Sequence, residues 1–249
     1  MSIPYAIIFL VLAALAGLVA ALAPGWFPRT VGAAGALSFL LVAIAYFGAG
    51  PRLLFKRAGG RRHPAAWIVH WPYFALTAFA FRLTVLSYRE GPYVRVAPNV
   101  FLGRRLKARE AKEAEAEGWL AVLDLAAELS ETRRLCKLAN YRSQPVLDAT
   151  ATSLDKLREA VEWVKSHAAN GPVYVHCALG HSRSATVVAA YLLAAGLASD
   201  AKSALKHLRE LRPGVRLNRA QRKLLNKFAE EMAESVGFSP GGAKDGSQG

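Results

Sequence analysis

The chain has 249 residues, of which 53% are hydrophobic, and it carries a formal net charge of +14. This length holds one domain of ordinary size plus a further segment, and so large an apolar share argues against a purely soluble protein. Two cysteines, Cys136 and Cys177, are too few for a disulfide framework, and we expect a reducing compartment.

The excess of basic residues fits either anionic lipid headgroups or nucleic acid. We favour lipid, because the apolar residues concentrate in the first 86 positions and place the chain at a bilayer. The sequence contains no nucleic-acid motif with interleaved aromatic residues, so a nucleic-acid partner is not expected.

Two long uncharged runs open the chain, at 3–23 and 31–50. Pro24-Gly25 ends the first and Pro51 follows the second. A helix of about 20 apolar residues spans the hydrocarbon core of a bilayer, so the pair predicts a transmembrane hairpin. A cleaved signal peptide is the alternative for the first run, but no basic segment precedes it and a second run follows directly.

A third apolar segment, 65–81, contains Pro72 and clustered aromatic residues, and it either spans the bilayer or lies at its interface. Basic residues gather before it, at 52–62, and after it, at 82–109. The positive-inside rule places both clusters in the cytoplasm, which favours two spans and an interfacial third segment. We therefore expect 1–86 to be the membrane region of an integral protein of an inner or plasma membrane, with the rest of the chain on the cytoplasmic side.

Residues 92–236 alternate strand and helix patterns, and the polar tail 237–249 is expected to be disordered. Strands are predicted at 93–96, 100–102, 120–125, 144–147 and 173–176, and helices at 105–117, 153–167 and 184–193, with two more capped by Ser199 and by Asn218 with Gln221. This order predicts an α/β fold with a mostly parallel central sheet flanked by helices on both faces. Ligands of such sheets bind beyond the carboxyl ends of the strands.

The most specific motif follows the last predicted strand and reads His176-Cys177-Ala178-Leu179-Gly180-His181-Ser182-Arg183-Ser184. Between a strand and a helix, the backbone N–H groups from Ala178 to Arg183 can surround a tetrahedral dianion, aided by the positive end of the helix. The Arg183 guanidinium matches two phosphate oxygens. The same positive field favours the thiolate of Cys177, which can attack phosphorus.

Four other residues have predicted roles around this loop. Ser184 can donate a hydrogen bond to the departing sulfur, and Gly180 permits close backbone approach. We expect His176 to order the loop and His181 to form a wall of the pocket mouth.

A general acid must protonate the leaving oxygen. We favour Asp148, which follows the predicted strand at 144–147, over Asp124, which lies inside the strand at 120–125. Cys136 is interpreted as a small core residue, with a redox partner of Cys177 as the alternative.

These residues resemble the dual-specificity class of the cysteine-dependent protein tyrosine phosphatase superfamily, over about residues 93–232. The resemblance is carried by 173–177, 182–186, 141–148, Arg212-Pro213 and Asn218. It implies that Cys177 is the nucleophile, Arg183 the phosphate-binding arginine, Ser184 the assisting hydroxyl and Asp148 the general acid. It also implies that 92–236 is a phosphatase domain that needs no metal or other cofactor.

The spacing of Ala127-Glu128, Glu131-Thr132-Arg133 and Asp148 is most similar to the mitochondrial phosphatidylglycerophosphate phosphatase branch. That branch often carries basic residues inside the loop, where this chain has Ala178, Leu179 and His181. The difference argues against a highly phosphorylated inositol substrate.

Three functions follow from these observations. The chain is a phosphatase of phosphotyrosine, phosphoserine or phosphothreonine in proteins, a phosphatase of phospholipid headgroups such as phosphatidylglycerophosphate, or an inactive phosphate-binding scaffold at the membrane. The first two are nearly balanced. The third is disfavoured because the nucleophile, the arginine and an acid are all present.

Overall fold

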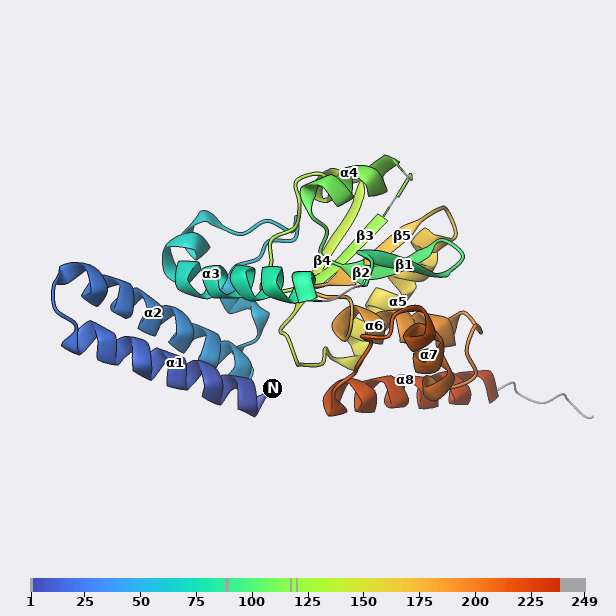
Figure 1. Ribbon diagram of the computed structural model, residues 1–249. Coiled ribbons are helices and arrows are strands. Elements are labelled where there is room, and N and C mark those ends of the chain that lie inside the picture. The colour runs from blue at the N-terminus through green and yellow to red at the C-terminus, as the bar shows by residue number, and fades with distance from the viewer. Residues whose placement is uncertain (1, 88–89, 117, 120, 238–249) are drawn as a thin grey trace, which may run out of the picture.

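The computed structural model describes residues 2–87, 90–116, 118–119 and 121–237 (Figure 1). Leu120, which opens the predicted third strand, lies outside the described residues, as do positions 238–249 of the predicted disordered tail.

The first two helices form a hairpin that projects from the rest of the molecule (Figure 1). They are α1 (Ile3–Leu22) and α2 (Trp26–Ile44), and a π-helical turn, η1 (Ala45–Ala49), continues α2. Among the described residues, two helices are long and apolar enough to cross a membrane, Ile3–Leu22 and Trp26–Ala49. The second starts before the predicted run because Pro28 falls in its first turn, where a missing N–H costs no hydrogen bond.

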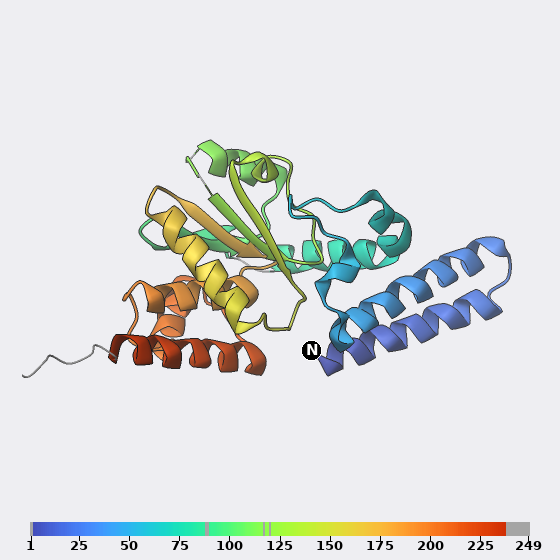
Figure 2. The ribbon, with the colours of Figure 1, turned by 180° about the vertical axis from the view of Figure 1, so that it is seen from behind.

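The predicted third apolar segment is a longer helix, α3 (Pro64–Ser87), which follows the short 3-10 turn η2 (Pro51–Leu54). It contains Pro72 and is not one of the two helices apolar enough to span. His70, Tyr73 and Phe74 form its buried face. Figures 1 and 2 both show α3 lying between the helical hairpin and the sheet.

The segment between α2 and α3 fastens the helical region to the rest of the chain. The Lys56 ammonium lies 2.6 Å from Asp124 Oδ2, and both side chains are at most 1% exposed. Lys56 also donates to the carbonyl of Ala126, and Arg62 donates to the carbonyl of Ala127 at 3.1 Å. The helical region is thus bonded directly to the end of a central strand.

The sheet has the strand order β1-β2-β5-β3-β4. The strands are β1 (Tyr93–Ala97), β2 (Val100–Arg104), β3 (Ala121–Ala126), β4 (Asn140–Val146) and β5 (Val173–Cys177). β1 and β2 form an antiparallel hairpin, and the pairs β2–β5, β5–β3 and β3–β4 are parallel. The predicted mostly parallel sheet is confirmed. β4 begins earlier than predicted because it is an edge strand, and the side chains of its first half are exposed or only partly buried and lack an apolar pattern.

Helices cover both faces of the sheet, as predicted (Figures 1 and 2). One face packs against α4 (Ala108–Ala116) and the 3-10 turn η3 (Leu135–Lys137), and the other carries α5 (Leu154–Ala168), α6 (Arg183–Ala194), α7 (Ala201–Leu211) and α8 (Arg219–Gly237).

The helix starts follow from their caps. Ser153 caps α5, and Asn218 and Gln221 bond each other's backbone N–H at the start of α8, as predicted. The predicted cap Ser199 is wrong, because Asp200 accepts from the Ser203 N–H at 2.6 Å. α4 starts at Ala108 rather than at residue 105, since β2 continues to residue 104.

Candidate active site

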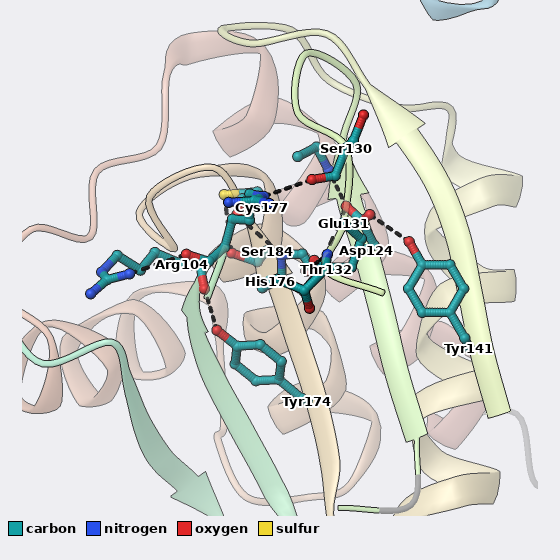
Figure 3. A network of polar contacts seen from close by, with 12 residues as sticks. Arg104, Asp124, Ser130, Glu131, Thr132, Tyr141, Tyr174, His176, Cys177 and Ser184 are labelled. Carbon is teal, nitrogen blue, oxygen red and sulfur yellow. Dashed lines mark hydrogen bonds and ion pairs between the residues drawn. The ribbon is translucent and has the colours of Figure 1, made fainter. Parts of the chain in front are cut away.

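The loop from Cys177 to Ser182 joins the end of β5 to the start of α6. Cys177 therefore lies at the carboxyl edge of the sheet, where the strand order predicts a ligand site. Figure 3 shows Cys177 close to Ser184, with the buried polar groups of Glu131, Asp124 and His176 gathered beside them.

Three carbonyl groups of this loop accept hydrogen bonds from donors outside it. The carbonyl of Ala178 accepts from the Arg105 N–H at 3.0 Å, that of Leu179 from Arg212 Nη2 at 2.8 Å, and that of His181 from the Arg216 N–H at 2.9 Å.

In a trans peptide the N–H points opposite to the carbonyl, so these contacts turn the next N–H groups, of Leu179, Gly180 and Ser182, towards the inside of the loop. The Gly180 N–H indeed donates to Cys177 Sγ at 3.3 Å. The result is a concave set of donors suited to an anion.

Gly180 is required at its position. Its φ is +77°, and a Cβ atom there would lie 2.4 Å from the carbonyl oxygen of Gly103. Only glycine adopts this conformation without strain while the loop lies so close to β2.

The Cys177 sulfur accepts hydrogen bonds from the Ser184 hydroxyl and from the Gly180 N–H, both at 3.3 Å. Burial alone would raise the pKa of this thiol. The positive charge of Arg183 and the hydrogen bonds outweigh burial and hold the pKa of Cys177 below its ordinary value. The site therefore favours a thiolate.

Arg183 is the central cation of the site. Its guanidinium makes two hydrogen bonds to the Glu128 carboxylate, at 2.6 and 2.7 Å, and a third to the carbonyl of Val146. Asp148 Oδ1 lies 3.1 Å from Nη2. Among the described residues, the Arg183 Nε–H has no hydrogen-bond partner although it is buried, so it is available to an oxygen of a bound anion.

Glu128 is a site residue to which the sequence pattern assigned no role. Burial would raise the pKa of its carboxyl, but Arg183 lowers it more, so the pKa lies below its ordinary value and the carboxylate stays ionised at neutral pH. Its place just beyond β3, at the same edge of the sheet as Cys177, was the signal that could have singled it out.

The two candidate acids have different surroundings. Asp148 follows β4, contacts Arg183 and keeps 47% of its side chain exposed. Asp124 is fully buried, pairs with Lys56 and accepts from the Tyr141 hydroxyl at 2.6 Å. Of these two acids, only Asp148 is exposed enough to meet a substrate.

His176 lies directly behind the loop. Its Nδ1 donates to the carbonyl of Cys177 at 3.2 Å, and its Nε2 lies 2.9 Å from Glu131 Oε2. Burial would lower the pKa of His176, but Glu131 and Asp124 raise it more, so its pKa lies above the ordinary value. This geometry supports the loop-ordering role predicted for His176.

Asp124, Glu131 and His176 bring three potential metal-ligand atoms within 4.8 Å of one another. The ammonium of Lys56 already neutralises Asp124, and His176 is paired with Glu131. These groups balance one another's charge, and the cluster fits a structural role.

Two other predicted residues have partners or surroundings apart from the sulfur. The His181 ring lies 2.6 Å from Glu90 Oε2, so this side chain anchors the loop. Cys136 lies in η3 and is a free thiol, like Cys177. Burial and then Glu131 raise the pKa of Cys136 to about 11, which makes it a poor nucleophile.

A strand-loop-helix that presents a low-pKa cysteine, inward N–H groups and an arginine defines the chemistry of a cysteine-dependent phosphatase. The comparisons with known proteins agree. The family of the dual specificity phosphatase catalytic domain matches residues 100–231, so the chain belongs to this family and is a phosphatase.

Two curated relatives illustrate the similarity. Phosphatidylglycerophosphatase and protein-tyrosine phosphatase 1 of Homo sapiens is 28% identical over 178 residues, which cover 67% of this chain and 87% of that protein. Dual specificity protein phosphatase 2 of Homo sapiens is 36% identical over 110 residues, which cover 43% of this chain and 34% of that protein. The predicted resemblance to the phosphatidylglycerophosphate phosphatase branch is confirmed.

A solved structure has the same fold. The crystal structure of PTPMT1 in complex with PI(5)P has a TM-score of 0.52 and 25% identity, and the match covers 59% of this chain and 99% of that one. The remaining 41% of this chain has no counterpart in that structure, and the helical region before residue 90 can account for most of it.

Proposed function

We propose that this chain hydrolyses phosphate monoesters on phospholipid headgroups, through a cysteinyl-phosphate intermediate on Cys177. The observation that carries the proposal is the Cys177 sulfur, held by Ser184 and Gly180 inside a loop whose N–H groups face inward next to Arg183.

In the first step, the loop N–H groups and Arg183 bind the phosphate dianion and neutralise its charge. The Cys177 thiolate attacks phosphorus in line, the S–P bond forms and the bond to the leaving oxygen breaks. Asp148 donates its proton to that oxygen. Glu128 positions Arg183 by its paired hydrogen bonds.

In the second step, water attacks the cysteinyl phosphate while the Asp148 carboxylate accepts its proton. The S–P bond breaks, inorganic phosphate forms and the thiolate returns. The Ser184 hydroxyl stabilises the departing sulfur through the hydrogen bond that it already makes at 3.3 Å.

Two observations support a lipid substrate. The human relative that this chain covers at 87% of its length is named for phosphatidylglycerophosphatase as well as protein-tyrosine phosphatase activity. The two apolar helices also favour a place at a membrane, where a lipid headgroup is present at high local concentration.

A phosphoprotein substrate is the second candidate. The higher identity, 36%, is to Dual specificity protein phosphatase 2, although over only 43% of this chain. A phosphotyrosine peptide is therefore the second substrate compared in the test.

The test compares purified full-length enzyme on phosphatidylglycerophosphate in mixed micelles and on a phosphotyrosine peptide. We expect a higher kcat/KM on the lipid and loss of all turnover in Cys177→Ser. If kcat/KM is about tenfold or more higher on the peptide than on the lipid, a difference of about 1.4 kcal/mol, the proposal of a lipid substrate is wrong. If Cys177→Ser turns over substrate as fast as the wild type, the cysteinyl-phosphate mechanism is wrong. If the wild type turns over neither substrate, the result favours an inactive scaffold.

We also propose that the α1–α2 hairpin spans an inner or plasma membrane with the phosphatase domain on the cytoplasmic side. Both open ends of the hairpin lie on the side of the sheet domain in Figure 1, which suits two spans. Reporters fused to the C-terminus test this topology, and a reporter active only outside the cytoplasm would contradict it.

A further inference from the structure

One cavity of about 190 Å³ is shared by the helical region and the candidate active site. On one side it is bounded by the loops after β3, β4 and β5, which contribute Glu128, Leu129, Asp148, Ala178 and Leu179. The cavity therefore opens directly onto the proposed general acid and the phosphate-binding loop.

The opposite wall comes from the helical region. It is built by α1, η1 and α3, and the residues that matter here are Tyr5, Phe9, Tyr46, Tyr73, Ala80 and Phe81. Tyr5 and Phe9 stack on Tyr46, with ring centroids 5.4 and 5.6 Å apart. The wall is a packed aromatic surface.

The two sides differ in polarity. The charged groups of the lining, Glu128 and Asp148, both lie on the catalytic side, and both are paired with Arg183. The helical wall adds two threonines, Thr77 and Thr84, whose hydroxyls donate to carbonyls of their own helix. Besides the hydroxyls of Tyr5, Tyr46 and Tyr73, the wall thus offers aromatic rings and methyl groups, which suit hydrocarbon better than the backbone of a peptide.

The wall is held in place relative to the catalytic loops. The Lys56–Asp124 ion pair and the hydrogen bond from Arg62 to the Ala127 carbonyl fix the helical region next to Glu128. Arg62 also lies 3.8 Å over the ring of Phe74 in α3. Because these contacts are buried, the cavity is formed before any substrate binds.

From this geometry we propose that the cavity is a subsite for the hydrocarbon next to the headgroup of a phospholipid substrate. This rests on the proposed function. The phosphate monoester enters the Cys177 loop, and the first part of the acyl chains lies against Tyr5, Phe9 and Tyr46. The exposed apolar faces of α1, with Ile8 52% and Val11 51% exposed, and of α2, with Leu37 51% exposed, continue from this wall and carry the rest of the chains into the bilayer.

The test fills the cavity from α3. Ala80 is exposed and lines the cavity, so Ala80→Leu and Ala80→Trp narrow it in two steps without replacing a buried residue. Ala75→Trp is the matched control, because Ala75 is an exposed alanine of the same helix that does not line the cavity. The substrates are dioleoyl phosphatidylglycerophosphate in mixed micelles and its deacylated, water-soluble headgroup.

We expect Ala80→Trp to lower kcat/KM on the diacyl lipid by about tenfold or more, with a smaller loss in Ala80→Leu. Turnover of the deacylated headgroup should stay within about twofold of the wild type in every variant, and Ala75→Trp should match the wild type on both substrates.

Three results would overturn the subsite while leaving the phosphatase chemistry intact. In the first, Ala80→Trp turns over the diacyl lipid as fast as the wild type. In the second, Ala80→Trp loses as much activity on the deacylated headgroup as on the diacyl lipid. In the third, the wild type turns over a phosphotyrosine peptide faster than the lipid, and Ala80→Trp slows the peptide and the lipid by the same factor. Failure of the proposed function would show in the wild type itself, which would then favour the phosphotyrosine peptide by about tenfold or more in kcat/KM, or turn over neither the lipid nor its headgroup.

Discussion

Removing the ammonium of Lys56 should destabilise the domain severely, although Lys56 lies outside the part of the chain that matches the phosphatase family. Lys56 Nζ lies 2.6 Å from Asp124, and the two side chains are 0% and 1% exposed. Lys56→Met keeps the unbranched stem and leaves the Asp124 carboxylate buried without its cation. Breaking a buried ion pair in this way costs about 3–5 kcal/mol.

The lower end of that range applies here, because Asp124 also accepts from the Tyr141 hydroxyl and from the Ala126 N–H. A loss of about 3 kcal/mol lowers the melting temperature by about 6–12 °C for a domain of this size. In Lys56→Met/Asp124→Leu both charges of this ion pair are removed together, so neither is left buried without its partner and the double variant should return to within about 2 kcal/mol of the wild type.

The assay follows residual turnover of p-nitrophenyl phosphate by full-length enzyme in detergent after heating. Arg57→Met is the control, since Arg57 is exposed and its loss removes the same charge from the same segment. A stabilising role of the Lys56–Asp124 ion pair is contradicted if Lys56→Met melts at the same temperature as the wild type, or if the double variant melts at as low a temperature as the single one.

The contribution of the Asp124 carboxylate to the stability of the fold depends on pH in a definite direction. Burial would raise the pKa of Asp124, but Lys56 and then His176 lower it more, so in the folded protein the pKa lies below its ordinary value. Its contribution to stability is therefore present above the ordinary carboxyl pKa of about 4 and is lost as the pH falls through the folded value. The difference in melting temperature between the wild type and Lys56→Met should therefore become smaller at acidic pH.

Three further predictions concern the site. Iodoacetamide should alkylate Cys177 at neutral pH well before Cys136, and Arg183→Ala should slow that reaction about tenfold for each unit by which the Cys177 pKa rises, as mass spectrometry of the two peptides would show. Asp148→Asn should lower kcat on the lipid by roughly 10²–10⁴-fold but lower it less on p-nitrophenyl phosphate, whose leaving group needs no proton, and equal losses would contradict a general acid. Ser184→Ala should slow breakdown of the cysteinyl phosphate by roughly 10²-fold, and a burst of p-nitrophenol in rapid-mixing experiments should reveal the accumulated intermediate, which a variant slowed in the first step would not show.

Local patterns were sufficient to predict most of the elements. The apolar stretches of β3 and β5, interrupted by Asp124 and His176, are buried on both faces, which is what a central parallel strand requires. The cap residues Ser153 and Asn218 could be named because a cap bonds to groups two or three residues away. β4 was predicted too short because the side chains in the first half of this edge strand are not fully buried, so burial imposes no apolar pattern there.

The sequence by itself was enough to propose the chemistry of the Cys177 loop, because one short segment carries the proposed nucleophile, the loop N–H groups and the arginine between a strand and a helix. Tertiary structure alone decided what surrounds that loop. Glu128 meets Arg183 across 55 positions, and Lys56 meets Asp124 across 68. The cavity wall brings Tyr5 of α1 next to Asp148 and Leu179. Contacts between residues so far apart leave no trace in local spacing, because packing of whole elements, and not the backbone between them, brings the side chains together.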